Sequence, residues 1–277
     1  MKKIAVINDL SGFGKCSLTA AIPVISAFKM QCCPLPTAVL SNQTGYDSYR
    51  CVDLTGEMPL FIEEWKKLGA RFDGILTGFI SNPKQGEIIE NFIKDFKGQN
   101  TLVVVDPVMA DDGVIYDTYE SDSITAVKNI AKLADVITPN LTEFCILCEK
   151  DFKEVFALSG EALLNEVKKM CREYAKDGNK KIVVTGIKAE NEMQTAIFEN
   201  GSFATVSSEY VNGNFSGTGD ILASFVTASL VGGETLYNSV LGACNLISKS
   251  LKSTMENDHS NKNYYADGVD FEKFLAF

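Results

Sequence analysis

Two glycines followed by a carboxylate mark the segment of the sequence with the clearest potential for chemistry. The residues Gly217-Thr218-Gly219-Asp220 run directly into an apolar stretch that predicts a helix over residues 218–231. Glycines at a helix start leave backbone N–H groups uncovered, and the helix dipole adds positive potential there. Such a start can hold the charge of a transferring phosphoryl group, while Asp220 accepts a proton from an attacking hydroxyl. An ordinary glycine-rich helix cap explains the same residues, and physical grounds alone slightly favour that simpler interpretation.

A second candidate is a carboxylate at the end of the most clearly buried strand. Residues 101–105, Thr-Leu-Val-Val-Val, form a run without alternation that is typical of a parallel strand covered on both faces, and Asp106 follows at once. A carboxylate there is well placed to meet a phosphate-bound metal ion, directly or through water. Asp111, Asp112 and Gly113 come shortly after, and a simple turn of the chain also explains them.

A third candidate lies where another strand gives way to a helix. The sequence Thr138-Pro139-Asn140 is followed three residues later by Glu143. Asn140 can cap the helix, with Glu143 in the position of a capping box, and this explains the motif without any ligand. In isolation we prefer that explanation. Three such motifs at strand ends and helix starts of one chain are nevertheless more informative together than singly.

The first loop resembles a phosphate-binding P-loop but lacks its defining residues. A P-loop has a glycine separated by four residues from its Gly-Lys pair and a hydroxyl directly after the lysine. Relative to the Gly-Lys pair at residues 14–15, those positions hold Asp9 and Cys16, so we reject a P-loop. The segment is still a glycine-rich turn. It can approach a ligand closely, with Asn8 and Ser11 pointing into a cleft, or it can be a plain tight turn.

The rest of the chain predicts the scaffold that these residues need. Short apolar runs alternate with longer segments of helical periodicity, which implies parallel strands joined by right-handed crossovers. Ligands then sit beyond the carboxyl ends of the strands. We predict an α/β fold with a central, mostly parallel sheet flanked by helices, in a single domain over residues 1–277. Strands are expected near residues 4–7, 72–77, 101–105, 136–137 and 181–184, with a hairpin over 193–207; helices are expected near 17–30, 124–133, 141–147, 160–174, 218–231 and 234–251.

Composition limits the partners and the location of the protein. The 277 residues carry a formal net charge of −10, which argues against a general affinity for nucleic acid or anionic membranes. The apolar run after the first residues is too short for a signal peptide, and no later stretch is long enough to cross a membrane. We therefore expect a cytoplasmic protein. Its one histidine, His259, lies in a polar stretch and receives no role.

Taken together and in this order, the three motifs resemble the signature set of the ribokinase superfamily. The resemblance spans nearly the whole chain, and the Asp-Pro-Val-Met and Gly-Thr-Gly-Asp motifs are quite specific as a pair. It implies a ribokinase-like three-layer fold and phosphoryl transfer from ATP to an alcohol. It further implies that Asp220 is the catalytic base and that Gly217, Thr218 and Gly219 form the anion hole.

The same resemblance assigns the nucleotide site. Asp106 and Glu143 would arrange Mg²⁺ and the triphosphate of ATP, with the metal contacted directly or through water. Asn140 and Thr185 would lie near the phosphates. The sequence leaves open whether a monovalent cation is also required.

The first half of the chain is similar to pyridoxal kinases in particular. The pattern of that group includes a serine in the first loop, a Ser-Asn-x-Thr-x-Tyr stretch, here residues 41–46, and a Gly-Tyr/Phe loop. By this resemblance Asp111 would lie near the catalytic centre. The side chains that would hold the substrate ring are Ser11, Thr44, Tyr46 and Phe79.

Three functions remain open. The first is ATP-dependent phosphorylation of the 5′-hydroxymethyl group of pyridoxal, pyridoxine or pyridoxamine in vitamin B6 salvage. Hydroxymethylpyrimidine kinases of thiamine synthesis share the phosphate-handling motifs, and Ala110 departs from the glycine more usual in the first group; residues 41–46 favour the B6 ring. The third function, from another class, is a non-catalytic B6-binding protein. The resemblance also implies small-molecule substrates and a homodimer.

Overall fold

One mostly parallel sheet organises the chain. The structure is a computed structural model, and it describes residues 1–117, 119–176, 180–189, 192–211, 213, 215–256 and 264–275, so that His259 lies outside the described residues. In this part of the chain the sheet has nine strands in the order β11-β10-β9-β8-β5-β4-β1-β2-β3. The strands are β1 (Lys3–Ser11), β2 (Gln31–Leu40), β3 (Cys51–Asp53), β4 (Gly74–Thr77), β5 (Leu102–Val105), β8 (Val136–Ile137), β9 (Lys181–Ala189), β10 (Glu192–Glu199) and β11 (Ser202–Glu209).

The strands from β9 to β2 in this order pair in parallel. At one edge β10 pairs antiparallel with both β9 and β11, and at the other edge β3 pairs antiparallel with β2. A separate small hairpin joins β6 (Ala110–Asp111) to β7 (Val114–Ile115). The predicted mostly parallel sheet is confirmed. The prediction of a single domain stays a prediction.

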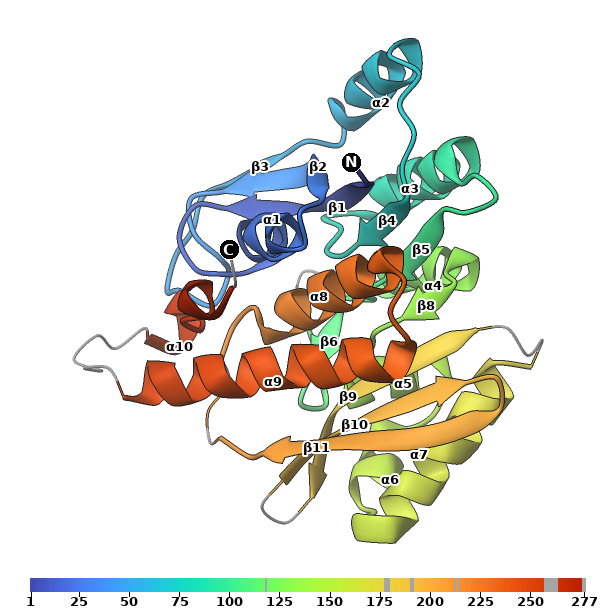
Figure 1. The fold of residues 1–277 in the computed structure, drawn as a ribbon, viewed down its shortest axis with the longest axis vertical. Helices are drawn as coiled ribbons and strands as arrows, with labels where there is room; N and C mark the ends of the chain where they lie inside the picture. The colour runs from blue at the N-terminus through green and yellow to red at the C-terminus, as the bar shows by residue number, and fades with distance from the viewer. Residues whose placement is uncertain are drawn as a thin grey trace.

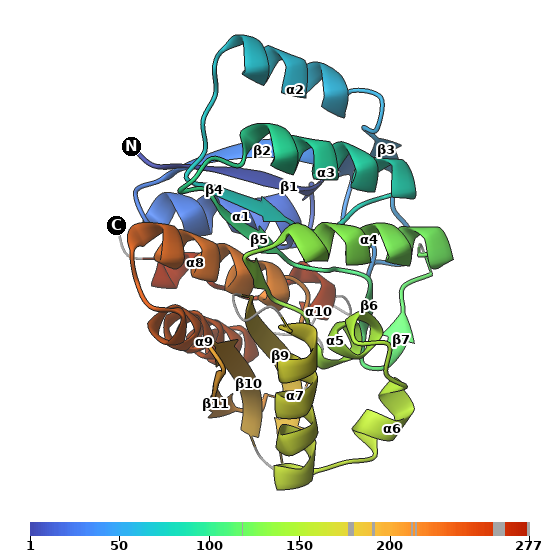
Figure 2. The same cartoon turned by 90° about the vertical axis from the view of Figure 1, so that its right-hand side faces the viewer.

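Helices cover both faces of the sheet, which makes three layers (Figures 1 and 2). In β1, Ile4 and Val6 point to one core, while Ala5 and Ile7 point to the other. This explains why such strands are unbroken apolar runs. The first core contains residues of α1 (Ser17–Ala27), α8 (Thr218–Gly232) and α9 (Leu236–Met255). The second contains residues of α2 (Met58–Lys67), α3 (Pro83–Phe96), α4 (Ser121–Leu133), α5 (Leu141–Leu147), α6 (Phe152–Phe156) and α7 (Gly160–Tyr174).

The order of the strands reverses at β1, which has β2 on one side and β4 on the other. In an open α/β sheet, such a switch point opens a crevice beyond the carboxyl ends of the strands. β4 pairs with β1 only as far as Ile7, so Asn8 and the residues after it lie in this region. Asp106 follows β5, and Asn140 follows β8. The fold therefore brings the candidate motifs together at the carboxyl ends of the central strands.

The sequence patterns did not predict β2, which contains Pro34 and Pro36. Proline removes a ladder donor and is normally confined to sheet edges. Here β3 pairs only with residues from Ala38 onward, so both prolines lie where β2 is itself the edge strand. Helix α2 was not predicted either. None of the described helices is long and apolar enough to cross a membrane.

Candidate active site

Two glycines at the start of α8 have different surroundings: the backbone at Gly217 has no room for a side chain, whereas Gly219 borders open space. Gly217 is the N-cap residue, with φ of 83° in the left-handed region. A Cβ on Gly217 would come 1.8 Å from the carbonyl oxygen of Lys15, so a side chain cannot fit. A Cβ on Gly219 would meet no described atom within 4 Å. The first N–H groups of a helix have no intrahelical partner. This helix start can therefore receive an anion.

The carboxylate of Asp220 is held by groups from β1 and from the first residue of α1. Asn8 Nδ2 donates to Asp220 Oδ1 over 3.1 Å, and the backbone N–H of Ser17 also donates to this carboxylate. Ser17 has φ of 49°, which is uncommon for a residue other than glycine. Such backbone strain is concentrated at functional sites. Burial, aided by the charge of Asp9, raises the pKa of Asp220 to about 6, although the two hydrogen bonds act in the opposite direction.

Asn8 connects Asp220 to two of the residues predicted to hold the substrate. Its Oδ1 accepts the backbone N–H of Phe79 over 2.9 Å and that of Asp9 over 3.0 Å. Ser11 Oγ donates to Asp9 Oδ2 over 2.8 Å. Burial raises the pKa of Asp9 although this hydrogen bond lowers it. Ser11 and Phe79 thus belong to the same polar cluster as the carboxylate of Asp220.

The capping box predicted for α5 is confirmed. Asn140 Oδ1 accepts the backbone N–H of Glu143 over 2.9 Å, and Glu143 Oε2 accepts that of Asn140 over 2.9 Å. Glu143 Oε1 accepts the N–H of Met109 over 3.1 Å, and Asn140 Nδ2 donates to the carbonyl of Ala110 over 2.7 Å. Asn140 also forms a parallel bridge with Thr185. These bonds fasten the loop after β5 to the start of α5.

Several carboxyls of the site raise one another's pKa. Burial is the largest cause for Asp106 and for Glu143, followed by the charge of Asp220 beside Asp106 and that of Asp106 beside Glu143. The charge of Asp111 adds a smaller effect on Glu143. A cation bound here would relieve this repulsion.

The donor set fits a hydrated Mg²⁺ better than a metal enclosed by protein ligands. Within the described ranges, no three His, Cys, Asp or Glu side chains converge on a possible metal. Mg²⁺ typically uses one or two carboxylates, several waters and the substrate phosphates. Thr138 is the one described hydrogen-bond donor to Asp106, at 2.9 Å from Oδ1, which leaves capacity for a cation. Both oxygens of Glu143 accept backbone N–H groups, so contact through water suits it better.

The other residues predicted to hold the substrate lie at the border of the site. Tyr46 is half-buried, and its hydroxyl donates to Asp267 in α10 (Tyr264–Asp267). Thr44 is exposed, and none of the described contacts joins it to Asp220. A cavity of about 290 Å³ beside Tyr46 has further walls from Phe13, Asn42, Asp47 and Ser48.

Sequence reasoning gave no role to Lys15, Ser17 or Asp9. The rejection of a P-loop is supported, because the ammonium of Lys15 forms ion pairs with two carboxylates. Asp9 had a usable signal, since it comes directly after the first apolar run and Asn8. No sequence signal could identify Ser17, because its contribution is a backbone N–H, which every residue except proline has.

Similar proteins act on two kinds of ring. The family model described as phosphomethylpyrimidine kinase matches residues 18–264. A crystal structure from Bacteroides thetaiotaomicron, provisionally described as a phosphomethylpyrimidine kinase and containing pyridoxal, is 36% identical, with a TM-score of 0.91 over 99% of this chain and 94% of that one. This overlap confirms the ribokinase-like fold.

Two curated relatives carry the two kinds of name. A pyridoxine/pyridoxal/pyridoxamine kinase from Bordetella avium is 22% identical over 87% of this chain and 82% of its own length. A hydroxymethylpyrimidine/phosphomethylpyrimidine kinase from Staphylococcus aureus is 28% identical over 66% of this chain and 63% of its own length. Because the family model covers most of the sequence, and the motifs expected of a kinase meet at one end of the sheet, the chain belongs to the phosphomethylpyrimidine kinase family.

Proposed function

We propose that this protein transfers the γ-phosphoryl group of ATP to the 5′-hydroxymethyl group of pyridoxal, pyridoxine or pyridoxamine. One observation supports the proposal above the others: the carboxylate of Asp220 lies at the glycine start of α8, bonded to Asn8 and Ser17. With its pKa raised to about 6, this group is ionised at neutral pH and still basic enough to accept a hydroxyl proton. The N–H groups at Gly217 to Gly219 would stabilise the charge on the transferring group.

ATP would lie along the carboxyl ends of β5, β8 and β9. Asp106 would hold hydrated Mg²⁺ directly, and Glu143 would act through water. When bound, the metal ion neutralises charge on the phosphates. Asn140 and Thr185 would line the phosphate path, because the bridge between them joins the start of α5 to β9.

A B6 ring is favoured over a pyrimidine for two reasons. The Bacteroides relative, which aligns over 99% of this chain, contains pyridoxal in its crystals. The stretch 41–46 also has the pattern of pyridoxal kinases. The ring would be held by Ser11, Thr44, Tyr46 and Phe79, with Asp111 near the reacting groups. A homodimer and a cytoplasmic location remain expectations from the sequence.

Hydroxymethylpyrimidine is the second candidate substrate, favoured by the family model and by the Staphylococcus aureus relative. The same base and the same helix start would serve it. A non-catalytic B6-binding protein is the third possibility, and dependence of ADP release on both substrate and Mg²⁺ excludes it.

The first experiment measures ADP release with ATP and Mg²⁺ in a coupled assay, comparing the three B6 vitamers and hydroxymethylpyrimidine by kcat/KM. We expect a preference for a B6 vitamer. Replacing Asp220 with Asn should lower kcat by about 10²–10⁴-fold, because proton transfer to a positioned base is lost. Asp122→Asn is the matched control, since Asp122 is also a first-turn carboxylate but lies on α4. Its turnover should stay at the wild-type rate.

Each outcome has a distinct meaning. A preference for the pyrimidine would keep the chemistry and replace the substrate. Equal losses in the two variants would show that the loss does not depend on a base at Asp220, because Asp122 lies on a different helix. No turnover with any of the four compounds would contradict the proposed substrates and leave the fold and family unaffected.

A further inference from the structure

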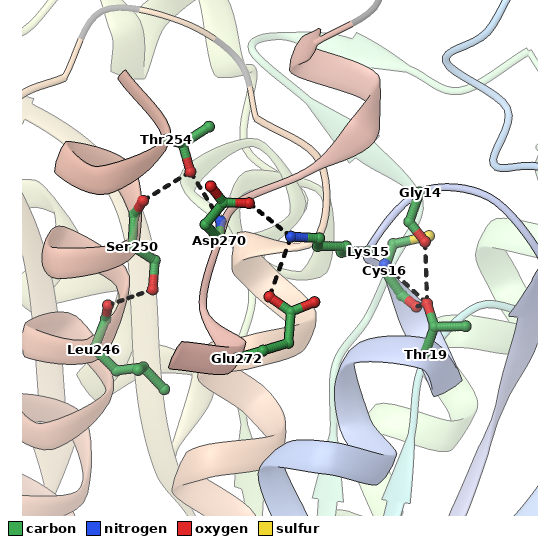
Figure 3. Close-up of polar contacts among 9 residues, drawn as sticks. All are labelled: Gly14, Lys15, Cys16, Thr19, Leu246, Ser250, Thr254, Asp270 and Glu272. Atoms are coloured by element: carbon green, nitrogen blue, oxygen red, sulfur yellow. Dashed lines mark hydrogen bonds and ion pairs between the residues drawn. The ribbon is translucent and has the colours of Figure 1, made fainter. Parts of the chain in front are cut away.

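The loop between β1 and α1 is fastened to the other end of the chain by one lysine. Lys15 Nζ donates to Asp270 Oδ1 over 2.8 Å and to Glu272 Oε2 over 3.1 Å (Figure 3). Asp270 is 255 residues away in the sequence. Burial alone would lower the pKa of Lys15, but the two hydrogen bonds raise it, so the ammonium stays charged. The lysine that resembled a P-loop residue is therefore committed to protein carboxylates.

The partner side of this contact is itself anchored. The backbone N–H of Asp270 donates to Thr254 Oγ1 over 2.8 Å, and that hydroxyl donates to the carbonyl of Ser250 over 2.7 Å in α9 (Figure 3). The backbone N–H of Lys15 donates to the carbonyl of Asp267 over 3.1 Å. Both the side chain and the backbone of the lysine thus bind a segment that is fixed to a long helix of the core.

The backbone carbonyl of Lys15 contacts the start of α8. Its carbonyl oxygen lies against Gly217, so closely that a Cβ on that glycine would come within 1.8 Å. Two residues further along the chain, the N–H of Ser17 donates to the Asp220 carboxylate. The chain between Lys15 and Ser17 is held in place by Thr19, whose Oγ1 forms hydrogen bonds with the carbonyls of Gly14 over 3.1 Å and Cys16 over 2.7 Å (Figure 3). A shift of Lys15 would therefore be transmitted to the helix start and to the carboxylate.

We infer, on the basis of the proposed function, that Lys15 is a positioning residue for phosphoryl transfer. Its double ion pair with Asp270 and Glu272 holds the first loop against Gly217 and keeps the Ser17 N–H directed at Asp220. A partly exposed ion pair contributes little to folding. A misplacement of about 1 Å at a reacting group, however, can cost about 10²-fold in rate. The ion pair therefore matters more for turnover than for stability.

The substitution Lys15→Met tests this role, because methionine keeps an unbranched apolar stem and removes the ammonium. We expect kcat to fall by about 10- to 100-fold. KM for ATP should change little, since the ammonium is bound by Asp270 and Glu272 and the proposed nucleotide path runs along β5, β8 and β9. Lys15→Arg should recover most of the loss, because a guanidinium can also bind two carboxylates. Loss of a contact that served only folding would lower the melting temperature without this pattern.

The control is Lys97→Met, which breaks an ion pair of similar exposure far from the site. Lys97 and Asp135 lie 2.7 Å apart, with side chains 35% and 38% exposed, against 32% and 32% for Lys15 and Asp270. This variant should keep the wild-type kcat. Combining Lys15→Met with Asp270→Asn and Glu272→Gln should add little to the loss from Lys15→Met alone, since all three remove one interaction.

A second measurement makes the test independent of turnover. Amide hydrogen exchange should be faster in Lys15→Met than in Lys97→Met at residues 12–19 and at the start of α8. Wild-type kcat in Lys15→Met, or unchanged exchange at the start of α8, would overturn the inference. A wild-type enzyme inactive on every substrate tested would instead contradict the proposed function, and the exchange experiment would still decide the role of Lys15.

Discussion

At the scale of single residues, the environment of Asp220 sets its acidity by opposing effects. Burial raises its pKa to about 6, and the nearby charge of Asp9 acts in the same direction. Donors from Ser17 and Asn8 stabilise the ionised form and limit the change. Other ionisable groups also face this carboxylate: Cys16 from the first loop, Asp106 from the end of β5 and Tyr116 from the loop after β7. The balance gives a base that is ionised at neutral pH.

The pH dependence of turnover should report this group. A base must be deprotonated to act, so kcat/KM for the free enzyme should fall below pH about 6, by about tenfold per pH unit. Asp9→Asn removes a negative charge that raises the pKa of Asp220, so it should move this acidic limb to lower pH. The measurement is a pH–rate profile at saturating Mg²⁺. A limb that persists unchanged in Asp220→Asn would assign it to another group.

At the scale of elements, α8 and the loop before α1 form one unit. The helix begins at a left-handed glycine because the carbonyl of Lys15 occupies the space that a side chain would need. Two residues later, the helix presents Gly219 to open space. The two glycines therefore have different reasons to be glycine: contact with the protein for Gly217, and access to a ligand for Gly219.

Alanine substitutions at Gly217 and Gly219 distinguish the need for close packing from the need for ligand access. Gly217→Ala should lower both the melting temperature and kcat, because a Cβ there meets Lys15 O at 1.8 Å and φ is 83°. Gly219→Ala should keep or raise the melting temperature, since alanine is the better helix former by about 1 kcal/mol. Its kcat should still fall by about tenfold or more, because the methyl group occupies the space of the incoming phosphoryl group. Thermal melts and turnover measure both. Wild-type kcat in Gly219→Ala would mean that the phosphoryl group does not approach there.

At the scale of the whole molecule, the site concentrates negative charge in a chain whose formal net charge is already −10. Burial and neighbouring charge raise the pKa of Asp106 and Glu143 in the folded state. A carboxyl with a raised folded pKa binds more protons folded than unfolded, so its contribution to stability decreases as pH rises above the unfolded value. Without nucleotide and metal, these carboxyls therefore make the protein less stable at neutral pH than their protonated forms would.

The substitution Asp106→Asn should separate stability from activity. At neutral pH the variant should melt higher than the wild type, by about 2–4 °C for each kcal/mol of repulsion removed. The gain should shrink near pH 4, where the wild-type carboxyl is protonated as well. Mg²⁺ with ATP should stabilise the wild type more than the variant, and turnover of the variant should be lost. A lower melting temperature at neutral pH would show that the Asp106 charge stabilises the apo protein.

Much of the scaffold is legible in the sequence because local patterns record burial and capping. The run at residues 101–105 marks a strand covered on both faces, and α7 has the bounds expected from its periodicity, Gly160–Tyr174. The capping box of Asn140 and Glu143 follows from their spacing. The glycine start of α8 can also be predicted from the sequence, because glycine readily adopts the left-handed conformation found at Gly217. These features depend on interactions within a few residues, and sequence spacing encodes them directly.

Tertiary structure decided the features that depend on distant contacts. Strand β2 tolerates two prolines because β3 pairs only with its second half. The role of Lys15 depends on carboxylates at the far end of the chain, and the donor on Asp220 is a backbone N–H set by a left-handed Ser17. Neither residue type nor spacing specifies such partners, because packing brings them together only after the sheet and its two layers of helices have formed.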